Sequence, residues 1–176
     1  MTRTSAALAI AALAGGCFQP LYGTHKADGG EAISTKMSGV DVAKIDLPNG
    51  TRLSRIGVEV RNQVIFNLTG GGPAQTPTHK LEIHLTSTLA QVIVDVNTAR
   101  PDIQNYGIDA TFTLIDLSTG KAVVSGQTFS RVSYDIPGQE QRFAGERGLR
   151  DAENRAAQVI ADNIRSRLAS YFVAGS

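Results

Sequence analysis

The chain has 176 residues, with 17 basic and 16 acidic side chains, a formal net charge of +1 and one cysteine. This length indicates a single domain with a core of ordinary size. The balanced charge and the 6% aromatic content argue against a nucleic-acid binder, while one cysteine excludes a disulfide scaffold and any structural zinc site that needs several thiolates.

The N-terminal residues have the three parts of a secretory signal. Arg3 supplies the positive charge, residues 5–13 are mostly apolar, and the small residues 14–16 stand directly before Cys17. The apolar stretch is shorter than the roughly 20 residues that a permanent membrane helix needs. The run before Cys17 resembles the lipobox of bacterial lipoproteins, although Ala14 stands where leucine is usual. A cysteine that merely follows an ordinary signal is the alternative.

The lipobox resemblance implies cleavage before Cys17 and acylation of that residue. Its thiol would carry a diacylglycerol, its new amino group would carry a palmitoyl-type chain, and no thiol would remain for catalysis or metal binding. Removing the signal peptide 1–16 leaves 160 residues with equal numbers of acidic and basic side chains. We expect residues 17–39 to form the acylated N-terminus and a tether, and residues 40–176 to form one domain.

A short strand and a helix are the first elements expected in that domain. Apolar residues over 40–47 predict the strand, which a Pro-Asn-Gly turn ends. Over 51–69 the apolar side chains recur every three or four residues, which predicts a helix capped by Asn49 or Thr51 and ended by the glycine-rich residues 70–73. Three arginines fall mainly on the polar side of this helix and are expected to be solvated: Arg52, Arg55 and Arg61.

Three antiparallel strands are expected next. Residues 78–96 alternate between apolar and polar side chains, and the apolar set changes face near Gln91, which predicts a strand with a bulge or break. Further along the chain we expect a loop over 97–105, a strand over 106–114, a hairpin turn over 117–121 and a returning strand over 123–134.

A long helix is expected at the C-terminal end. The apolar period runs from Leu149 to Tyr171, and the acid-first pairs Glu146/Arg150 and Asp151/Arg155 have helical i,i+4 spacing. The order of elements predicts an α+β fold of two layers. In it, an approximately four-stranded, mainly antiparallel sheet has two helices packed on one face.

The sequence contains no recognised catalytic or phosphate-binding motif. We therefore expect the protein to have no enzymatic activity and to need no cofactor. His25, His79 and His84 lack metal-ligand spacing, so no metal site is expected, and His84 is expected to be exposed on a strand. A catalytic triad assembled from distant segments is left open, because a triad is recognised by its geometry and not by its spacing.

Three segments together resemble the lipopolysaccharide (LPS) assembly lipoprotein family LptE in its alphaproteobacterial form. They are residues 17–23 after the lipobox, residues 52–62 of the first helix, and residues 151–168 of the last helix. The resemblance implies a non-enzymatic, lipid-anchored protein of the outer membrane that plugs the β-barrel LptD, assists its assembly and binds LPS. It would face the periplasm or lie within the barrel lumen. Phe18 fits this location, because it replaces the aspartate that retains enteric lipoproteins in the inner membrane.

LPS binding requires cations that face phosphate groups. Arg100 in its loop and Lys121 in the hairpin turn are the candidates, because loops are free to present charge, although each also fits an ordinary solvated cation. Two other functions remain as alternatives. One is a different periplasm-facing lipoprotein adaptor of an envelope or secretion complex, and the other is a hydrolase without a recognisable motif.

Overall fold

A computed structural model describes residues 32–94, 101–136 and 142–174. The chain forms a four-stranded sheet in the order β1-β2-β3-β4, in which β1 is parallel to β2 and the other neighbours are antiparallel. The strands are β1 (Val40–Val42), β2 (His79–Val94), β3 (Pro101–Asp116) and β4 (Ala122–Asp135). The helices in the described ranges are α2 (Ile33–Ser38), α3 (Arg52–Thr69) and α4 (Arg142–Val173).

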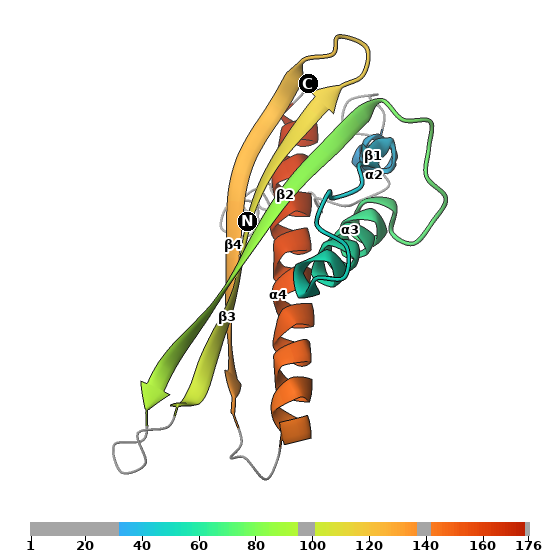
Figure 1. Cartoon of the computed structure of the whole chain (residues 1–176). Coiled ribbons are helices and arrows are strands. Elements are labelled where there is room, and N and C mark those ends of the chain that lie inside the picture. The colour runs from blue at the N-terminus through green and yellow to red at the C-terminus, as the bar shows by residue number, and fades with distance from the viewer. Residues whose placement is uncertain (1–31, 95–100, 137–141, 175–176) are drawn as a thin grey trace, which may run out of the picture.

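The predicted α+β fold class is confirmed. Figure 1 shows α4 running along the strands, with α3 beside it and α2 near the start of β2. The inward-facing side chains between Leu81 and Leu85 on β2 and between Tyr106 and Leu114 on β3 are buried, whereas those of the opposite sheet face are mainly exposed or half-buried. The helices therefore cover one face of the sheet and leave the other open.

Helix α3 has the boundaries that its sequence signals predict. The backbone N–H of Ser54 donates to the Thr51 hydroxyl at 3.1 Å, which makes Thr51 the N-cap. Gly70 ends the helix in the left-handed region at φ 63°, and its N–H donates to the Phe66 carbonyl at 2.8 Å. The apolar stripe of the helix is buried against the rest of the fold.

The strands largely follow the predicted pattern, with one correction. A register shift beside Gln91 confirms the predicted bulge, and Gly120 confirms the hairpin turn with φ 68°. The prediction of a loop over 97–105 is wrong from residue 101 onward. Strand β3 already begins at Pro101, which pairs with Val94. Proline is tolerated as the first residue of a strand, since no ladder donor is yet needed there.

The N-terminal part of the fold also differs from expectation. Residues 33–38, expected in the tether, form helix α2, and its Met37 is only 2% exposed. The strand expected over 40–47 is limited to Val40–Val42. It ends where Arg61 of α3 donates from Nε to the Val42 carbonyl at 3.0 Å, so this arginine holds α3 to the sheet instead of lying in solvent.

The core lies between the helices and the inner sheet face. Helix α4 brings five fully buried alanines to it, and these small side chains let the helix approach its neighbours closely. The largest fully buried side chains come from both layers: Ile56, Leu81, Ile108, Leu114, Ile160, Ile164 and Leu168.

Candidate functional site

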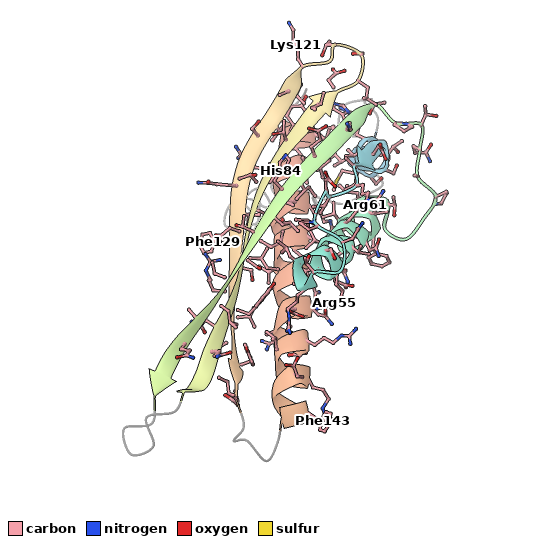
Figure 2. All side chains as sticks on the ribbon, in the orientation of Figure 1. Arg55, Arg61, His84, Lys121, Phe129 and Phe143 are labelled. Carbon is pink, nitrogen blue, oxygen red and sulfur yellow. The ribbon has the colours of Figure 1, made fainter. Side chains whose placement is uncertain are left out.

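Of the residues proposed from sequence, only Lys121 lies in the described part of the chain. Cys17 and Arg100 lie outside the described residues. Lys121 is exposed in the turn between β3 and β4, at one end of the sheet (Figure 2).

The open face of the sheet is polar, and in the described ranges it carries two ion pairs. One joins Lys80 Nζ to the Glu82 carboxylate on β2 at 2.8 Å. Arg131 of β4 donates from one nitrogen to both carboxylate oxygens of Asp109 on β3, at 2.8 and 2.9 Å. Its guanidinium also lies 5.5 Å from the ring centroid of Phe129. That ring is 66% exposed and points away from α4 (Figure 2). As expected, His84 is exposed on this face.

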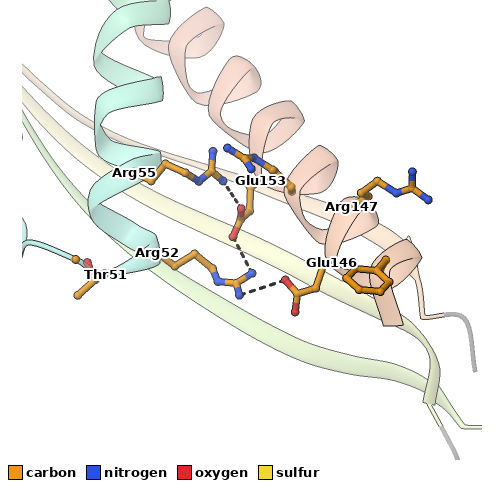
Figure 3. A pocket seen from close by; sticks show the side chains of 9 residues that line it. Thr51, Arg52, Arg55, Glu146, Arg147 and Glu153 are labelled. Atoms are coloured by element: carbon orange, nitrogen blue, oxygen red, sulfur yellow. Dashed lines mark hydrogen bonds and ion pairs between the residues drawn. The ribbon is translucent and has the colours of Figure 1, made fainter. Parts of the chain in front are cut away.

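A cleft between α3 and α4 collects charged side chains that sequence reasoning had assigned to solvent. Glu153 of α4 is only 2% exposed and forms ion pairs with Arg55 and, at 3.5 Å, with Arg52 (Figure 3). The expectation that Arg52 and Arg55 are simply solvated is therefore wrong. Desolvation of a carboxylate is costly, and these two guanidinium groups offset that cost.

The two predicted pairs along α4 have different outcomes. Arg155 donates from Nε to Asp151 at 2.7 Å, as its spacing predicts. Glu146, in contrast, pairs with Arg52 of the other helix at 3.6 Å. Arg150 consequently has no ion pair within the described part of the chain.

The cleft is large enough to hold a small charged group. Its volume is about 690 Å³. Phe143 lies on its border and is 86% exposed. Four arginines and two glutamates are among the residues that line it. The full lining is Gly50, Thr51, Arg52, Arg55, Phe143, Glu146, Arg147, Arg150 and Glu153.

Among the described groups with shifted pKa values are His79, Tyr106 and Asp116. Burial lowers the pKa of His79, whose ring makes edge contacts with Tyr171 and Phe172 near the C-terminal end of α4. Burial raises the pKa of Tyr106, which lies beneath the charged cleft. Hydrogen bonds from Ser118 lower the pKa of Asp116 in the hairpin turn.

Two kinds of site are absent from the residues that the structure describes. No described helix is long and apolar enough to cross a membrane. No group of three or more histidine, cysteine, aspartate or glutamate side chains in the described ranges is arranged to hold a metal ion.

Residues 38–168 match the model of the family LptE, described as lipopolysaccharide-assembly. The chain belongs to the LptE family. This match includes all four strands, α3 and most of α4, and it confirms the family resemblance of the sequence. No curated protein is significantly similar to the chain in sequence.

Solved structures support the same fold. A lipoprotein from Caulobacter crescentus CB15 superposes with a TM-score of 0.61 at 20% identity, covering 82% of this chain and 97% of its own. Rare lipoprotein B from Shewanella oneidensis gives a TM-score of 0.53 at 14% identity, covering 76% of this chain and 94% of its own. At these identities the likeness concerns the fold alone. The LptE member described here is similar in fold to both.

The charged cleft is the feature that sequence reasoning missed, although one signal was present. Glu153 falls between Ala152 and Ala156, on the apolar side of the C-terminal helix. A carboxylate among buried positions requires a cationic partner. The sequence gives no indication that the partners are arginines about 100 residues earlier in the chain.

Proposed function

We propose that this protein is an outer-membrane lipoprotein that works with the β-barrel LptD to insert LPS into the outer leaflet and to assemble the barrel. The observation that carries the proposal is the LptE family match over residues 38–168. LptE is described as an LPS-assembly family, which gives the process, and the barrel partner is our extension of it. The role is non-enzymatic and needs no cofactor.

The shape and surface of the fold support a position inside a barrel. A compact chain of 160 residues, the length of the mature protein, has a radius of gyration of about 15 Å, so only a very large barrel accommodates it. The lumen of such barrels is polar. The open sheet face fits that environment, because it presents polar groups such as Asp109 and Arg131 with their charges paired.

Anchorage belongs to the N-terminal part of the proposal. Cleavage before Cys17 and acylation of its thiol and amino group attach three acyl chains to the mature protein. One chain of myristoyl length binds a membrane only marginally, and each buried methylene adds about 0.8 kcal/mol, so three chains hold the protein durably. The tether that follows lets the domain reach a partner in the same membrane.

Contact with LPS is a further part of the proposal, and Lys121 is its candidate residue in the described part of the chain. Lys121 is exposed in its turn. It is therefore free to approach an anionic headgroup, and Arg100 remains the second candidate from the sequence.

Co-purification tests the proposed partnership. The full-length protein carries a C-terminal tag, outer membranes are extracted with mild detergent, and co-purifying proteins are identified and quantified by mass spectrometry. We expect LptD in equimolar amount. Untagged wild-type protein carried through the same extraction controls for proteins that the affinity resin captures by itself. A stoichiometric partner of another kind, with no large barrel, would instead support a different lipoprotein adaptor.

A further inference from the structure

The cleft between α3 and α4 carries an excess of positive charge. Four of its lining residues are arginines and two are glutamates, so its formal charge is +2. Glu153 is buried at its base, and Glu146 is mostly exposed at its edge (Figure 3). The mature protein as a whole is formally neutral, so this excess is local.

The glutamates do not saturate the arginines. Charge-assisted hydrogen bonds from guanidinium to carboxylate are normally about 2.7–2.9 Å long. The two contacts of Arg52 are longer, at 3.6 Å to Glu146 and 3.5 Å to Glu153. Arg52 therefore keeps donor capacity, since a guanidinium has five N–H groups.

Two further arginines of the cleft have no carboxylate partner within the described ranges. They are Arg147 and Arg150, which lie one turn apart on α4 and are both exposed. Arg150 has lost its helical partner, because Glu146 contacts Arg52 instead. Figure 3 shows Arg147 at the outer rim of the cleft, turned away from Arg52. Its long, exposed side chain is free to turn toward a ligand.

The chemistry of the cleft selects a compact dianion. A phosphate monoester has a charge of about −1.5 to −2 at pH 7 and three acceptor oxygens. This charge matches the local excess, and the planar fork of arginine pairs with phosphate through two parallel hydrogen bonds. The exposed Phe143 ring at the border provides apolar surface for whatever the phosphate is attached to.

We infer that the cleft between α3 and α4 binds a phosphate monoester through Arg52, Arg147 and Arg150, either as free phosphate or as part of a lipid headgroup. The lipid form rests on the proposed function, because LPS assembly brings such a headgroup to the protein. The free form depends only on the chemistry of the cleft. This site is separate from Lys121, which lies in the turn after β3.

Binding measurements on the full-length protein in neutral detergent test this inference. Three probes are titrated: inorganic phosphate, bisphosphorylated lipid A, and lipid A from which both phosphates have been removed. The test variants are Arg150→Gln and the double variant Arg147→Gln/Arg150→Gln. Arg167→Gln is the matched control, because Arg167 is also an exposed arginine of α4 but lies outside the cleft. Urea unfolding verifies that each variant is folded.

We expect the double variant to bind both phosphorylated probes at least about tenfold more weakly, and Arg150→Gln to show part of this loss. Arg167→Gln should stay within about twofold of the wild type. If the double variant binds only inorganic phosphate more weakly, the ligand is free phosphate. If the wild type binds the two lipid A probes equally well, the lipid form is excluded. Unchanged binding of every probe by the double variant overturns the inference.

The co-purification assay separates this inference from the proposed function. The double variant is expected to retain its barrel partner, because the cleft is assigned to an anion. If the variant loses the barrel while its phosphate binding is unchanged, the cleft is a protein contact and the inference is wrong. If the wild type has no barrel partner but loses phosphate binding on mutation, the inference stands and the proposed function fails.

Discussion

Arg55 of α3 and Glu153 of α4 form an ion pair across the two helices, although 98 residues separate them in the chain. The carboxylate is 2% exposed and the guanidinium side chain is 34% exposed. A second nitrogen of Arg55 donates to Asn154 at 3.2 Å, which further fixes the guanidinium. This pair holds the first half of α4 against α3 and thereby shapes the charged cleft.

Glu153→Gln should reduce the free energy of unfolding by about 2–3 kcal/mol. The substitution leaves the Arg55 and Arg52 charges without a carboxylate at the base of the cleft, but their partial exposure to water reduces the cost below that of a fully buried pair. Asp151→Asn is the control, because Asp151 forms an exposed pair with Arg155 and should cost less than about 0.5 kcal/mol. Urea unfolding measures both, and equal losses would contradict the structural role of Glu153.

Gly126→Ala should destabilise the protein by about 1–3 kcal/mol, through overpacking. A Cβ atom at Gly126 would lie 2.7 Å from Cζ of Phe112, whose ring is buried between β3 and α4. Backbone preference alone predicts the opposite sign, since alanine is favoured over glycine in a strand by about 0.5–1 kcal/mol. Ser125→Ala changes the exposed neighbour and should have little effect. A higher Tm of Gly126→Ala in thermal unfolding would contradict the overpacking, because it would mean that the Phe112 ring moves aside for the added Cβ.

His79 should make the protein less stable at mildly acidic pH. Burial lowers its pKa in the folded state below the unfolded value near 6.5, so the unfolded chain binds the proton more readily. The contribution of the neutral ring to the free energy of unfolding is complete above pH 6.5, and it is lost as the pH falls through the lowered pKa. His79→Phe keeps a ring against Phe172 and should flatten the dependence of Tm on pH between 7.5 and 5. An unchanged slope, or an NMR titration of His79 with a midpoint above 6.5, contradicts this origin.

Cys17→Ala should release the protein from the membrane. The variant lacks the thiol that we propose to be acylated, so the mature protein loses its anchor. Mass spectrometry of the wild type should show an N-terminus at residue 17 that carries the added mass of three acyl chains. An unmodified Cys17, or membrane retention of the variant equal to that of the wild type, would favour an ordinary signal peptide.

Much of the fold was predictable because its signals are local. The boundaries of α3 follow from a capping threonine and a glycine, and the bulge near Gln91 follows from a change in the apolar alternation. Helix α2 was missed because six residues are too few to show a period. The start of β3 was placed too late because Pro101 is also a common loop residue, and only its pairing with Val94 identifies the strand.

The candidate site was less predictable because its contacts are distant in sequence. Helical spacing places Glu146 beside Arg150, but the approach of α3 brings Arg52 close enough to take this partner. Likewise, the polar side of α3 was expected to be solvated, whereas its arginines meet Glu153 of the other helix. Such pairings depend on how two helices pack, which a periodic pattern does not specify.

The appearance of LPS at the cell surface after depletion of this protein tests the central claim most directly. Cells with a repressible copy are labelled with an LPS-specific reagent that does not cross the outer membrane, and surface label is compared with total LPS. We expect surface LPS to fall while total LPS is maintained, with recovery when the wild-type protein is restored. Normal surface LPS in fully depleted cells would contradict a role in LPS assembly.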